Sequence, residues 1–448
     1  MASSRRLSAA ELPSHVVSVV KAQVSENSRL CVGLSGGRDS VVLLHLLVEA
    51  RRNFPIRLSA IHVNHQISPN ADRWAEFCVP LCEKLDVPLT VERVNVSRES
   101  GKGLEATARE MRYAVYRAVD ADIIALAHHR GDQAETVLLQ ALRGAGLKGI
   151  SAMPLIKTLI PGKTILRPLL NVTPESLAEF AAANSLIWIH DESNDDTRFT
   201  RNFLRHEIFP RLPPQSMKNL ARLGSHAAEA QILLDDLAVI DLGAIAIDGH
   251  LRRSSLLELT EARAKNTLRY YFAKESIPLP NAIQLQEIMH QLTHRQADDQ
   301  TEITWAQWRI RCFGDELHFM PARHQEKNPW CIEWQGEEQI ELPQDNGLLI
   351  AQRQFGAGIS QAKIAGKKCS VRSRSGGEKI CLGEKRPRRA LKNLLQEASV
   401  WPWERAVMPL FFCEDDLVWV PGIGVDVDYV VQVGEVGLCF NWQRPSAR

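Results

Sequence analysis

The chain has 448 residues, of which 45% are hydrophobic and 24% are charged, and its formal net charge is only +1. These values are typical of a globular protein of about two to four domains and exclude a disordered or fibrous chain. No apolar run approaches the ~18 residues of a membrane span, and no secretory signal is evident, so we expect a cytoplasmic protein without a membrane partner. The nine cysteines are scattered without a C-x-x-C pair, which disfavours a disulfide framework and a zinc ribbon.

Short β-rich runs alternate with helical patterns from residue 29 to about residue 190. The predicted strands are Leu30–Leu34, Leu58–Asn64, Leu89–Val96, Ile123–Leu126 and Thr164–Leu166. Helices are predicted at Val41–Glu49, Asp72–Leu85, Leu104–Val119, Gln133–Leu142 and Pro174–Asn184. This alternation predicts an α/β domain with a doubly wound, Rossmann-like parallel sheet, and ligands of such sheets bind at the carboxyl ends of the strands.

The first strand ends at the most informative motif of the chain, Ser35-Gly36-Gly37-Arg38-Asp39-Ser40. Its glycines let the backbone approach phosphate oxygens, its serines offer hydroxyls, and the helix start offers unpaired N–H groups. Asp39 is placed to hold a magnesium ion against the phosphates. No lysine follows the second glycine, so this is not a Walker A motif. The hexapeptide resembles the PP-loop of N-type ATP pyrophosphatases, which cleave ATP between the α and β phosphates; an ordinary strand-to-helix turn is the alternative.

Two further groups of polar residues follow predicted strands. His128 and Asp132 come after the fourth strand, where a histidine can stabilise charge or move a proton and an aspartate can bind magnesium or an ammonium group. Alternatively, Asp132 caps the next helix, with Glu135 as its capping-box partner. Arg109 and Arg112 lie three residues apart on one helical face and can clamp phosphate, unless they are simply solvated.

An acidic, turn-rich segment from Asp191 to Asp196 leads into a helix that carries Arg201. A satisfied surface network of ion pairs is the alternative interpretation of this segment. The hexapeptide, His62–His65 and His128-His129 all fall where strands should end. We therefore expect these motifs to converge on one crevice.

The strand–helix alternation ends near Arg211. Long helices are predicted at Met217–Leu256 and Leu259–Phe272, followed by a hairpin of Thr301–Arg311 and Glu316–Met320 and a linker at Arg323–Asn328. A small α+β domain is predicted last, with strands Cys369–Arg374, Leu417–Pro421 and Tyr429–Val433 and a helix Arg389–Glu397. The predicted domains are thus 1–212, a helical domain 213–325, and 326–448.

The last domain carries a basic segment between Lys367 and Lys392. Ten basic residues stand there against two acids: Lys367, Lys368, Arg372, Arg374, Lys379, Lys385, Arg386, Arg388, Arg389 and Lys392. Such a segment can contact nucleic-acid phosphates, although a solvated charged loop is the alternative.

Together these motifs resemble the tRNA(Ile)-lysidine synthetase family. In the first domain the resemblance rests on Ser35–Ser40, Val63–His65, Ala106–Tyr113, His128–Thr136 and Asp191–Asn202. It continues at Arg374–Glu378, Leu391–Glu397, Pro402-Trp403 and Val420–Val425, and it is weakest between about 230 and 300. One departure is clear: the family usually has two aspartates before the glutamine of the histidine block, and the first of them is Gly131 in this chain, while Asp132 stays in register.

The resemblance implies a two-step reaction on an isoleucine tRNA with the anticodon CAU. The C2 carbonyl oxygen of the wobble cytidine attacks the α-phosphate of ATP and pyrophosphate leaves. The ε-amino group of free lysine then attacks C2 and AMP leaves. The modified base pairs with A instead of G, so the tRNA changes its identity from methionine to isoleucine. A homodimer is a further implication.

The resemblance also implies roles for individual residues, with ATP and Mg²⁺ as cofactors. Residues Ser35 to Ser40 cradle the phosphates, and Asp39, Arg109, His128, Asp132 and Arg201 surround the reacting centre, Asp39 and Asp132 as candidate magnesium ligands. Glu135 is a candidate for binding the lysine ammonium group. Arg112 is a candidate substrate contact, and Arg374 and Arg389 are candidates for contacting the tRNA.

Two other functions stay open. A PP-loop tRNA thiolase uses the same adenylation step and then delivers sulfur from a reactive thiol. Cys78 and Cys82 lie four residues apart on an amphipathic helix, and no cysteine lies in the crevice motifs, which disfavours sulfur chemistry. A non-catalytic RNA-binding module with a decayed nucleotide site is supported only by Gly131. Pyrophosphate release with the correct RNA separates an enzyme from such a module.

Overall fold

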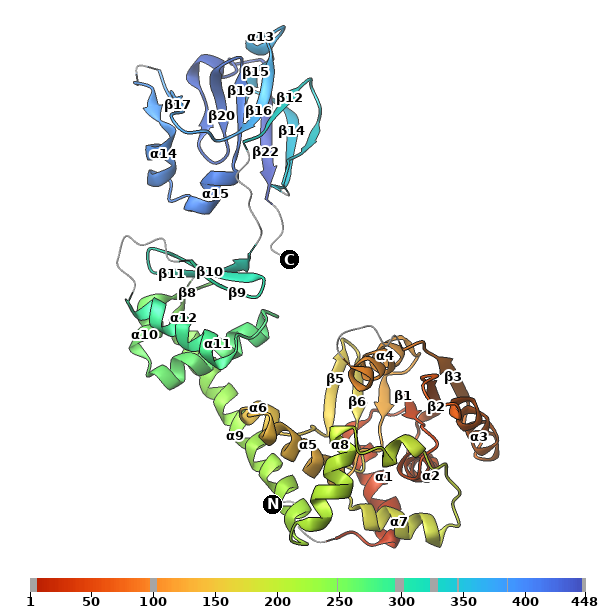
Figure 1. Cartoon of the computed structure of the whole chain (residues 1–448). Helices are drawn as coiled ribbons and strands as arrows, with labels where there is room; N and C mark the ends of the chain where they lie inside the picture. The colour runs from red at the N-terminus through yellow and green to blue at the C-terminus, as the bar shows by residue number, and fades with distance from the viewer. Residues whose placement is uncertain are drawn as a thin grey trace. The chain divides into compact units, whose positions relative to one another are not determined.

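The computed structural model describes residues 6–96, 103–247, 249–294, 302–322, 329–344, 346–384 and 386–444. The chain divides into two compact units, Met1–Leu234 and Asp235–Arg448, which we call the first and second units and describe separately (Figure 1). The predicted linker Arg323–Asn328 and Lys385 of the basic segment lie outside the described residues. The two boundaries between the three predicted domains stay predictions.

A six-stranded sheet forms the centre of the first unit, in the order β3-β2-β1-β4-β6-β5. Its strands are β1 (Arg29–Gly33), β2 (Arg57–Asn64), β3 (Leu89–Arg93), β4 (Ile123–Ala125), β5 (Ile156–Ile160) and β6 (Lys163–Leu166). All neighbouring strands are parallel except β5 and β6. The predicted parallel α/β sheet is therefore confirmed. The edge strand β5 was not predicted, because its middle residues Lys157 and Thr158 are exposed and give no apolar run.

Helices cover both faces of this sheet. They are α1 (Leu12–Gln23), α2 (Arg38–Asn53), α3 (Ala71–Lys84), α4 (Leu104–Ala118), α5 (Arg130–Leu142), α6 (Leu147–Ile150), α7 (Pro174–Ala183) and α8 (Thr200–Phe203). Alternate residues of β1 enter different cores: Leu30 and Val32 join the core that contains α1, α2 and α7, whereas Cys31 joins the core that contains Tyr116 of α4. This two-sided burial confirms the doubly wound arrangement.

The second unit begins within the long helix α9 (Ser216–Ile245). Its next elements are β7 (Ala246–Ile247), β8 (His250–Arg252), α10 (Arg253–Glu258), α11 (Glu261–Lys274), α12 (Ala282–His294), β9 (Glu302–Trp305), β10 (Trp308–Phe313) and β11 (Glu316–Pro321). Because β8 pairs with β11, the chain leaves α9 at Ile245, and the prediction of one helix over Met217–Leu256 is wrong. The predicted strand Thr301–Arg311 is divided by a turn at Ala306, whose φ is +49°. Helix α12 was not predicted, and the hairpin of β10 and β11 is confirmed.

The last part of the second unit is a β-rich α+β fold, as predicted in outline. Its strands are β12 (Cys331–Trp334), β13 (Gln339–Glu341), β14 (Leu348–Phe355), β15 (Ile359–Ser360), β16 (Cys369–Ser373), β17 (Lys379–Ile380), β18 (Arg389–Ala390), β19 (Pro409–Cys413), β20 (Asp416–Val420), β21 (Gly424–Val425) and β22 (Val436–Gln443). Its helices are α13 (Gln361–Ile364), α14 (Leu391–Glu397) and α15 (Pro402–Val407). They surround two sheets, ordered β12-β16-β19-β20-β21 and β13-β14-β22-β15.

Two predictions for this part are corrected. Tyr429–Val433 is not a strand, because a short 3-10 turn at Val427–Tyr429 opens it and the Asp426 carboxylate accepts a hydrogen bond from the Asp428 N–H. The predicted helix starts at Leu391 instead of Arg389, because Arg389 pairs with Ile380 in the small β17–β18 ladder. Among the helices that the structure describes, none is both long and apolar enough to cross a membrane.

Candidate active site

The PP-loop follows β1 in a conformation that requires a glycine at position 36. Gly36 has a φ of +86°, and a Cβ at this position would lie 2.5 Å from Cδ1 of Ile189. The Ser40 hydroxyl donates to the Gly37 carbonyl at 2.8 Å and lies 3.1 Å from the Ser35 hydroxyl. Ser40 is buried and Ser35 is exposed. Ser40 therefore braces the loop from inside. The Ser35 hydroxyl accepts a hydrogen bond from the Gly37 N–H at 3.4 Å but is exposed at the cavity, where it can meet a ligand.

Two adjoining cavities lie at the carboxyl ends of the strands. The PP-loop cavity, of about 550 Å³, is lined by Gly37, Arg38 and Arg109, and the inner cavity, of about 500 Å³, is lined by Asp132, Arg201 and Asn202. Both share walls made by Ser35, Asp39, His65, Arg112, His128 and Asp191. The structure thus brings together the predicted PP-loop, histidine, arginine and acidic motifs in one crevice.

Asp39 lies in the first turn of α2, and its carboxylate is held by two neighbours. Oδ1 accepts a hydrogen bond from Nε of Arg38 at 3.0 Å, and Oδ2 lies 3.5 Å from Nε2 of His129. Burial alone would raise the pKa of Asp39, but the hydrogen bond from His129 and the charges of His129 and Arg38 hold it below its usual value. Asp39 is therefore an ionised carboxylate at the edge of the PP-loop cavity.

This carboxylate suits magnesium bound through a substrate. Among the described residues, no group of three His, Cys, Asp or Glu side chains is arranged to hold a metal. Magnesium, however, is commonly bound by one or two carboxylates together with substrate phosphates. Asp39 beside a phosphate-binding loop fits that chemistry. The other predicted ligand, Asp132, already accepts a hydrogen bond from the His129 N–H at 2.9 Å.

His128 comes after β4 and has a buried, unpaired ring nitrogen. Its Nδ1 has no hydrogen-bond partner within the described structure. Burial lowers the pKa of His128 to about 3, and nearby arginines act in the same direction, while only the charge of Asp132 opposes them. The ring is therefore neutral at physiological pH and leaves a polar atom for a bound molecule.

His129 has a different role, because it caps α5. Its Nδ1 accepts hydrogen bonds from the N–H groups of Gly131 (3.0 Å) and Asp132 (3.3 Å), so the proton of the neutral ring is on Nε2, which faces Asp39. Asp132 completes the capping box, and Glu135 does not take part in it. A Cβ at position 131 would lie 2.8 Å from Cε1 of His129. Gly131 therefore leaves room for the capping ring.

Glu135 anchors two arginines of the inner cavity. It is 2% exposed, and its oxygens accept hydrogen bonds from Nε of Arg201 (3.0 Å) and from Nε and Nη2 of Arg205 (2.7 and 3.0 Å). Nη2 of each arginine also lies 3.5 Å from Oδ1 of Asp132. Nη2 of Arg201 is buried without a hydrogen bond, so it can donate to a ligand. Arg205, in a π-helical turn at Leu204–Ile208, was not predicted as a site residue.

The two arginines of α4 contact aromatic partners at the crevice. Nε of Arg112 donates to Nε2 of His65 at 3.2 Å; since arginine cannot accept, the proton of neutral His65 is on Nδ1. That buried N–H has no partner among the described residues. Burial and the charge of Arg112 lower the pKa of His65 to about 4, so the ring stays neutral. Arg109 packs over the Tyr113 ring with 5.0 Å between its guanidinium carbon and the centroid.

Further residues in or near the crevice were not predicted as site residues. Arg167 directly follows β6, is 2% exposed and donates to the Pro154 carbonyl at 2.7 Å. Its charge acts on His128. The strand-end rule that found the other motifs also applied to Arg167. Trp74 and Trp188 line the PP-loop cavity, and the Ile189 N–H donates to the Gly36 carbonyl at 2.9 Å, which ties a distant segment to the loop.

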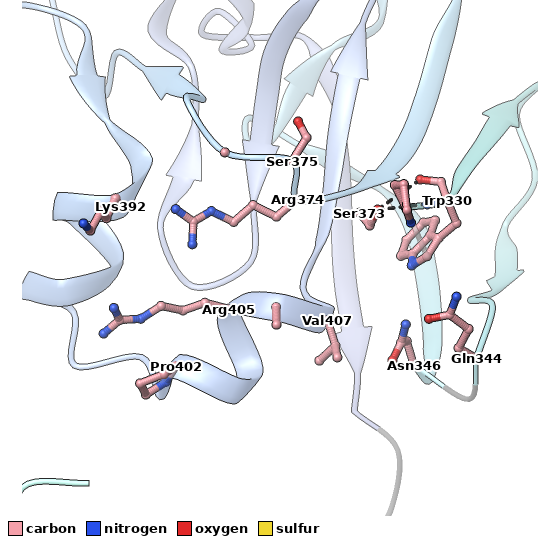
Figure 2. A pocket seen from close by; sticks show the side chains of 13 residues that line it. Trp330, Gln344, Asn346, Ser373, Arg374, Ser375, Lys392, Pro402, Arg405 and Val407 are labelled. Carbon is pink, nitrogen blue, oxygen red and sulfur yellow. Dashed lines mark hydrogen bonds between the residues drawn. The ribbon is translucent and has the colours of Figure 1, made fainter. Parts of the chain in front are cut away.

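The two predicted tRNA contacts lie in the second unit. Arg374 lines a separate pocket of about 620 Å³ (Figure 2). Arg389 is exposed and forms an ion pair with Glu397. These residues are therefore not part of the crevice around the PP-loop.

Comparison with known proteins covers nearly the whole chain. Family models described as a PP-loop domain, a TilS substrate binding domain and a TilS substrate C-terminal domain match residues 10–212, 251–318 and 369–442. The chain is 43% identical to the tRNA(Ile)-lysidine synthase of Nitrosomonas europaea, over 100% of this chain and 98% of the relative. It is 41% identical to that of Chromobacterium violaceum (88% and 91% covered) and 36% identical to that of Coxiella burnetii (94% and 95% covered). The chain belongs to the tRNA(Ile)-lysidine synthase family.

Proposed function

We propose that this protein ligates lysine to C2 of the wobble cytidine in the CAU anticodon of an isoleucine tRNA, with ATP cleaved to AMP and pyrophosphate. One observation carries the proposal: the PP-loop, an ionised Asp39, a neutral His128 and paired arginines line two adjoining cavities. The names of the relatives support the choice of tRNA and reaction. The predicted homodimer and cytoplasmic location stay predictions.

In the first step, the C2 oxygen of the cytidine attacks the α-phosphate and pyrophosphate leaves. This step needs alignment and positive charge more than a nucleophilic side chain. Backbone N–H groups at the start of α2 cradle the phosphates, and Arg109 and Arg112 lie at the same cavity. The unpaired Nδ1–H of His65 adds a neutral donor to an anionic oxygen. A magnesium ion held by Asp39 would neutralise charge on the phosphates.

In the second step, the lysine amine attacks C2 and AMP leaves. An ammonium group has a pKa near 10.4 and must lose a proton before it attacks. We assign His128 as the proton acceptor, because its ring is neutral and its Nδ1 is unpartnered. Burial and, after it, the surrounding arginines lower the pKa of His128 in the free protein. An anionic phosphate in the cavity would offset the charge of the arginines and so raise the basicity of the ring.

The existing contacts of Glu135 affect whether it can bind lysine. The prediction that it receives the lysine ammonium group stays a prediction. Because its oxygens already accept from Arg201 and Arg205, lysine would have to displace one of these arginines. We therefore propose that Glu135 first positions the two guanidinium groups, which then contact the phosphate or the departing AMP.

Sulfur delivery finds no support in the cavities. None of the nine cysteines lines either cavity. Cys78 lies beneath the PP-loop, but it is fully buried, and burial raises the pKa of its thiol to about 12. A buried, protonated thiol cannot serve as a sulfur carrier. The thiolase alternative is therefore disfavoured.

The proposal is tested by incubating the full-length protein with ATP, magnesium, labelled lysine and an isoleucine tRNA with the anticodon CAU. A methionine tRNA with the same anticodon is the control, and nucleosides are analysed by mass. We expect lysine on the wobble cytidine of the isoleucine tRNA only. ATP cleavage to AMP and pyrophosphate without lysine transfer would refute the ligase proposal and leave the adenylation chemistry in place.

A further inference from the structure

A second ligand-sized pocket lies in the β-rich part of the second unit, apart from the residues assigned to catalysis. Its volume is about 620 Å³, within the usual range for small-ligand sites. Five separate segments form it: the chain before β12, the loop after β13, the turn after β16, helix α14 and helix α15 (Figure 2). We call it the C-terminal pocket, and its polar or aromatic lining residues include Trp330, Asn346, Ser373, Arg374, Lys392 and Arg405.

One end of the C-terminal pocket is positively charged. The side chains of Arg374, Lys392 and Arg405 gather on one side of the view in Figure 2. No acidic residue is among the described residues that line the pocket. Burial, followed by the charge of Arg374, lowers the pKa of Arg405, so the two guanidinium groups repel each other. An anion bound between them would relieve this repulsion.

Two arginines of the basic segment that lie outside the pocket are paired with acids. Arg388 pairs with Asp426 and Asp428, and Arg389 pairs with Glu397. Arg374 does pair with Glu378, at 3.4 Å, but that carboxylate also accepts the N–H groups of Ser375 and Gly376. Nε of Arg405 donates only to a backbone carbonyl, that of Val400. The pocket therefore keeps a net positive charge, whereas the charges of Arg388 and Arg389 are balanced by paired acids.

The other end of the pocket is aromatic and rich in amides. Trp330 lies there beside Gln344 and Asn346 in Figure 2. Asn346 is 5% exposed, so its amide is directed to the pocket wall instead of solvent. An indole ring offers a stacking surface for a nucleobase, and amides match the hydrogen-bonding edge of a base. Groups that suit a phosphate and groups that suit a nucleobase thus lie at opposite ends of one cavity.

We propose that the C-terminal pocket binds one unpaired RNA nucleotide, with its phosphate between Arg374, Lys392 and Arg405 and its base against Trp330. A paired base is stacked inside a helix and cannot enter such a pocket, so the occupant is a single-stranded nucleotide. The pocket would bind a nucleotide of the RNA other than the one that reacts. The inference rests on the proposed function only in taking that RNA to be the tRNA substrate.

The test compares tRNA affinity of the full-length protein and its variants over a range of salt concentrations. Arg405→Gln should weaken binding and reduce the slope of log K against log salt by about one. Trp330→Ala should weaken binding about tenfold without changing the slope, and Trp330→Phe, which keeps a ring and the core contacts, should restore most of it. Arg52→Gln is the matched control, because this basic residue lies outside the pocket, in an exposed ion pair with Glu49; it should change neither quantity.

Competition identifies the occupant. A single-stranded RNA hexamer should displace labelled tRNA from the wild type. The hexamer should compete more weakly with Trp330→Ala, and Trp330→Phe should show a smaller loss of competition than Trp330→Ala. A hairpin with all bases paired and inorganic phosphate should displace little. Equal loss with Arg52→Gln and Arg405→Gln, or equal competition by the hairpin, would overturn the proposal in favour of diffuse attraction to phosphates. Lysine transfer by the wild type is measured in parallel, so that a failed pocket and a failed ligase assignment give different results.

Discussion

The two basic regions of this protein neutralise their charge in different ways. Around the PP-loop, Arg38 pairs with Asp39, and Arg201 and Arg205 share Glu135. In the C-terminal pocket, no acid is among the described lining residues. A site that must bind phosphates, a cation and an amine in turn needs fixed groups of both signs. A site that only holds a polyanion is better served by an excess of one sign.

This difference predicts different sensitivities. In the catalytic cavities the charged side chains form ion pairs with one another. Loss of one partner therefore leaves a buried charge unpaired and misplaced. In the C-terminal pocket the cations act largely in parallel. Catalytic variants should therefore show large losses in rate with unchanged tRNA affinity, and pocket variants the reverse.

Asp39→Ala should have the largest effect. Without this carboxylate, the proposed magnesium ion and the Nε2–H of His129 both lose a partner at the phosphates, and we expect pyrophosphate release to fall by about a thousandfold. Affinity for tRNA, measured by filter binding, should stay unchanged. Glu49→Ala, near the other end of α2 in an exposed pair with Arg52, is the control and should be silent. Unchanged pyrophosphate release by Asp39→Ala would remove Asp39 from the mechanism.

Glu135→Gln should come next and decides between two roles. If Glu135 positions Arg201 and Arg205, the amide should slow pyrophosphate release by about 10- to 100-fold and leave the KM for lysine nearly unchanged. A raised KM for lysine with normal pyrophosphate release would instead establish Glu135 as the ammonium ligand and contradict our proposal. Glu207→Gln, which removes an exposed ion pair with Arg211, should affect neither.

The buried histidine makes stability depend on pH in a defined window. Since the pKa of His128 is lowered to about 3 from an unfolded value near 6.5, the unfolded chain binds its proton first as pH falls. Its contribution to stability is complete above pH 6.5 and is lost as pH falls toward 3, by about 1.4 kcal/mol per pH unit at most. His128→Asn should flatten this acid limb in thermal unfolding between pH 7.5 and 5.

Much of the catalytic cavity was predictable because parallel strands place their carboxyl ends together. Ser35–Ser40, His65 and His128 each follow a strand, and the structure lines one crevice with them. Arg167 also directly follows a strand, and its charge acts on His128, although it was not predicted as a site residue. The partners of Glu135 were not predictable, because they lie 66 and 70 residues further along the chain, Arg201 in α8 and Arg205 in the π-helical turn.

The second unit shows where local patterns stop being informative. Helix α9 ends at Ile245 although apolar spacing continues, because β8 is held by its pairing with β11. Trp330, Arg374, Lys392 and Arg405 come from four segments with no shared motif, and only tertiary folding assembles them. The basic segment drew attention to Arg374 and Arg389 alike, and both form ion pairs, yet only Arg374 lines the pocket. Charge counting along a sequence does not see this difference in position.

The smallest expected effect is a difference in stability between variants of the two serines of the PP-loop, which the sequence alone does not distinguish. Ser40→Ala removes a buried donor to the Gly37 carbonyl, which is worth about 1 kcal/mol, so we expect a lower midpoint of thermal unfolding and a few-fold rise in the KM for ATP. Ser35→Ala removes an exposed hydroxyl and should raise the KM for ATP without lowering that midpoint. The reverse order of stability loss would show that Ser35 braces the loop. Neither change should alter tRNA affinity, because the contacts that we assign to tRNA binding lie in the second unit.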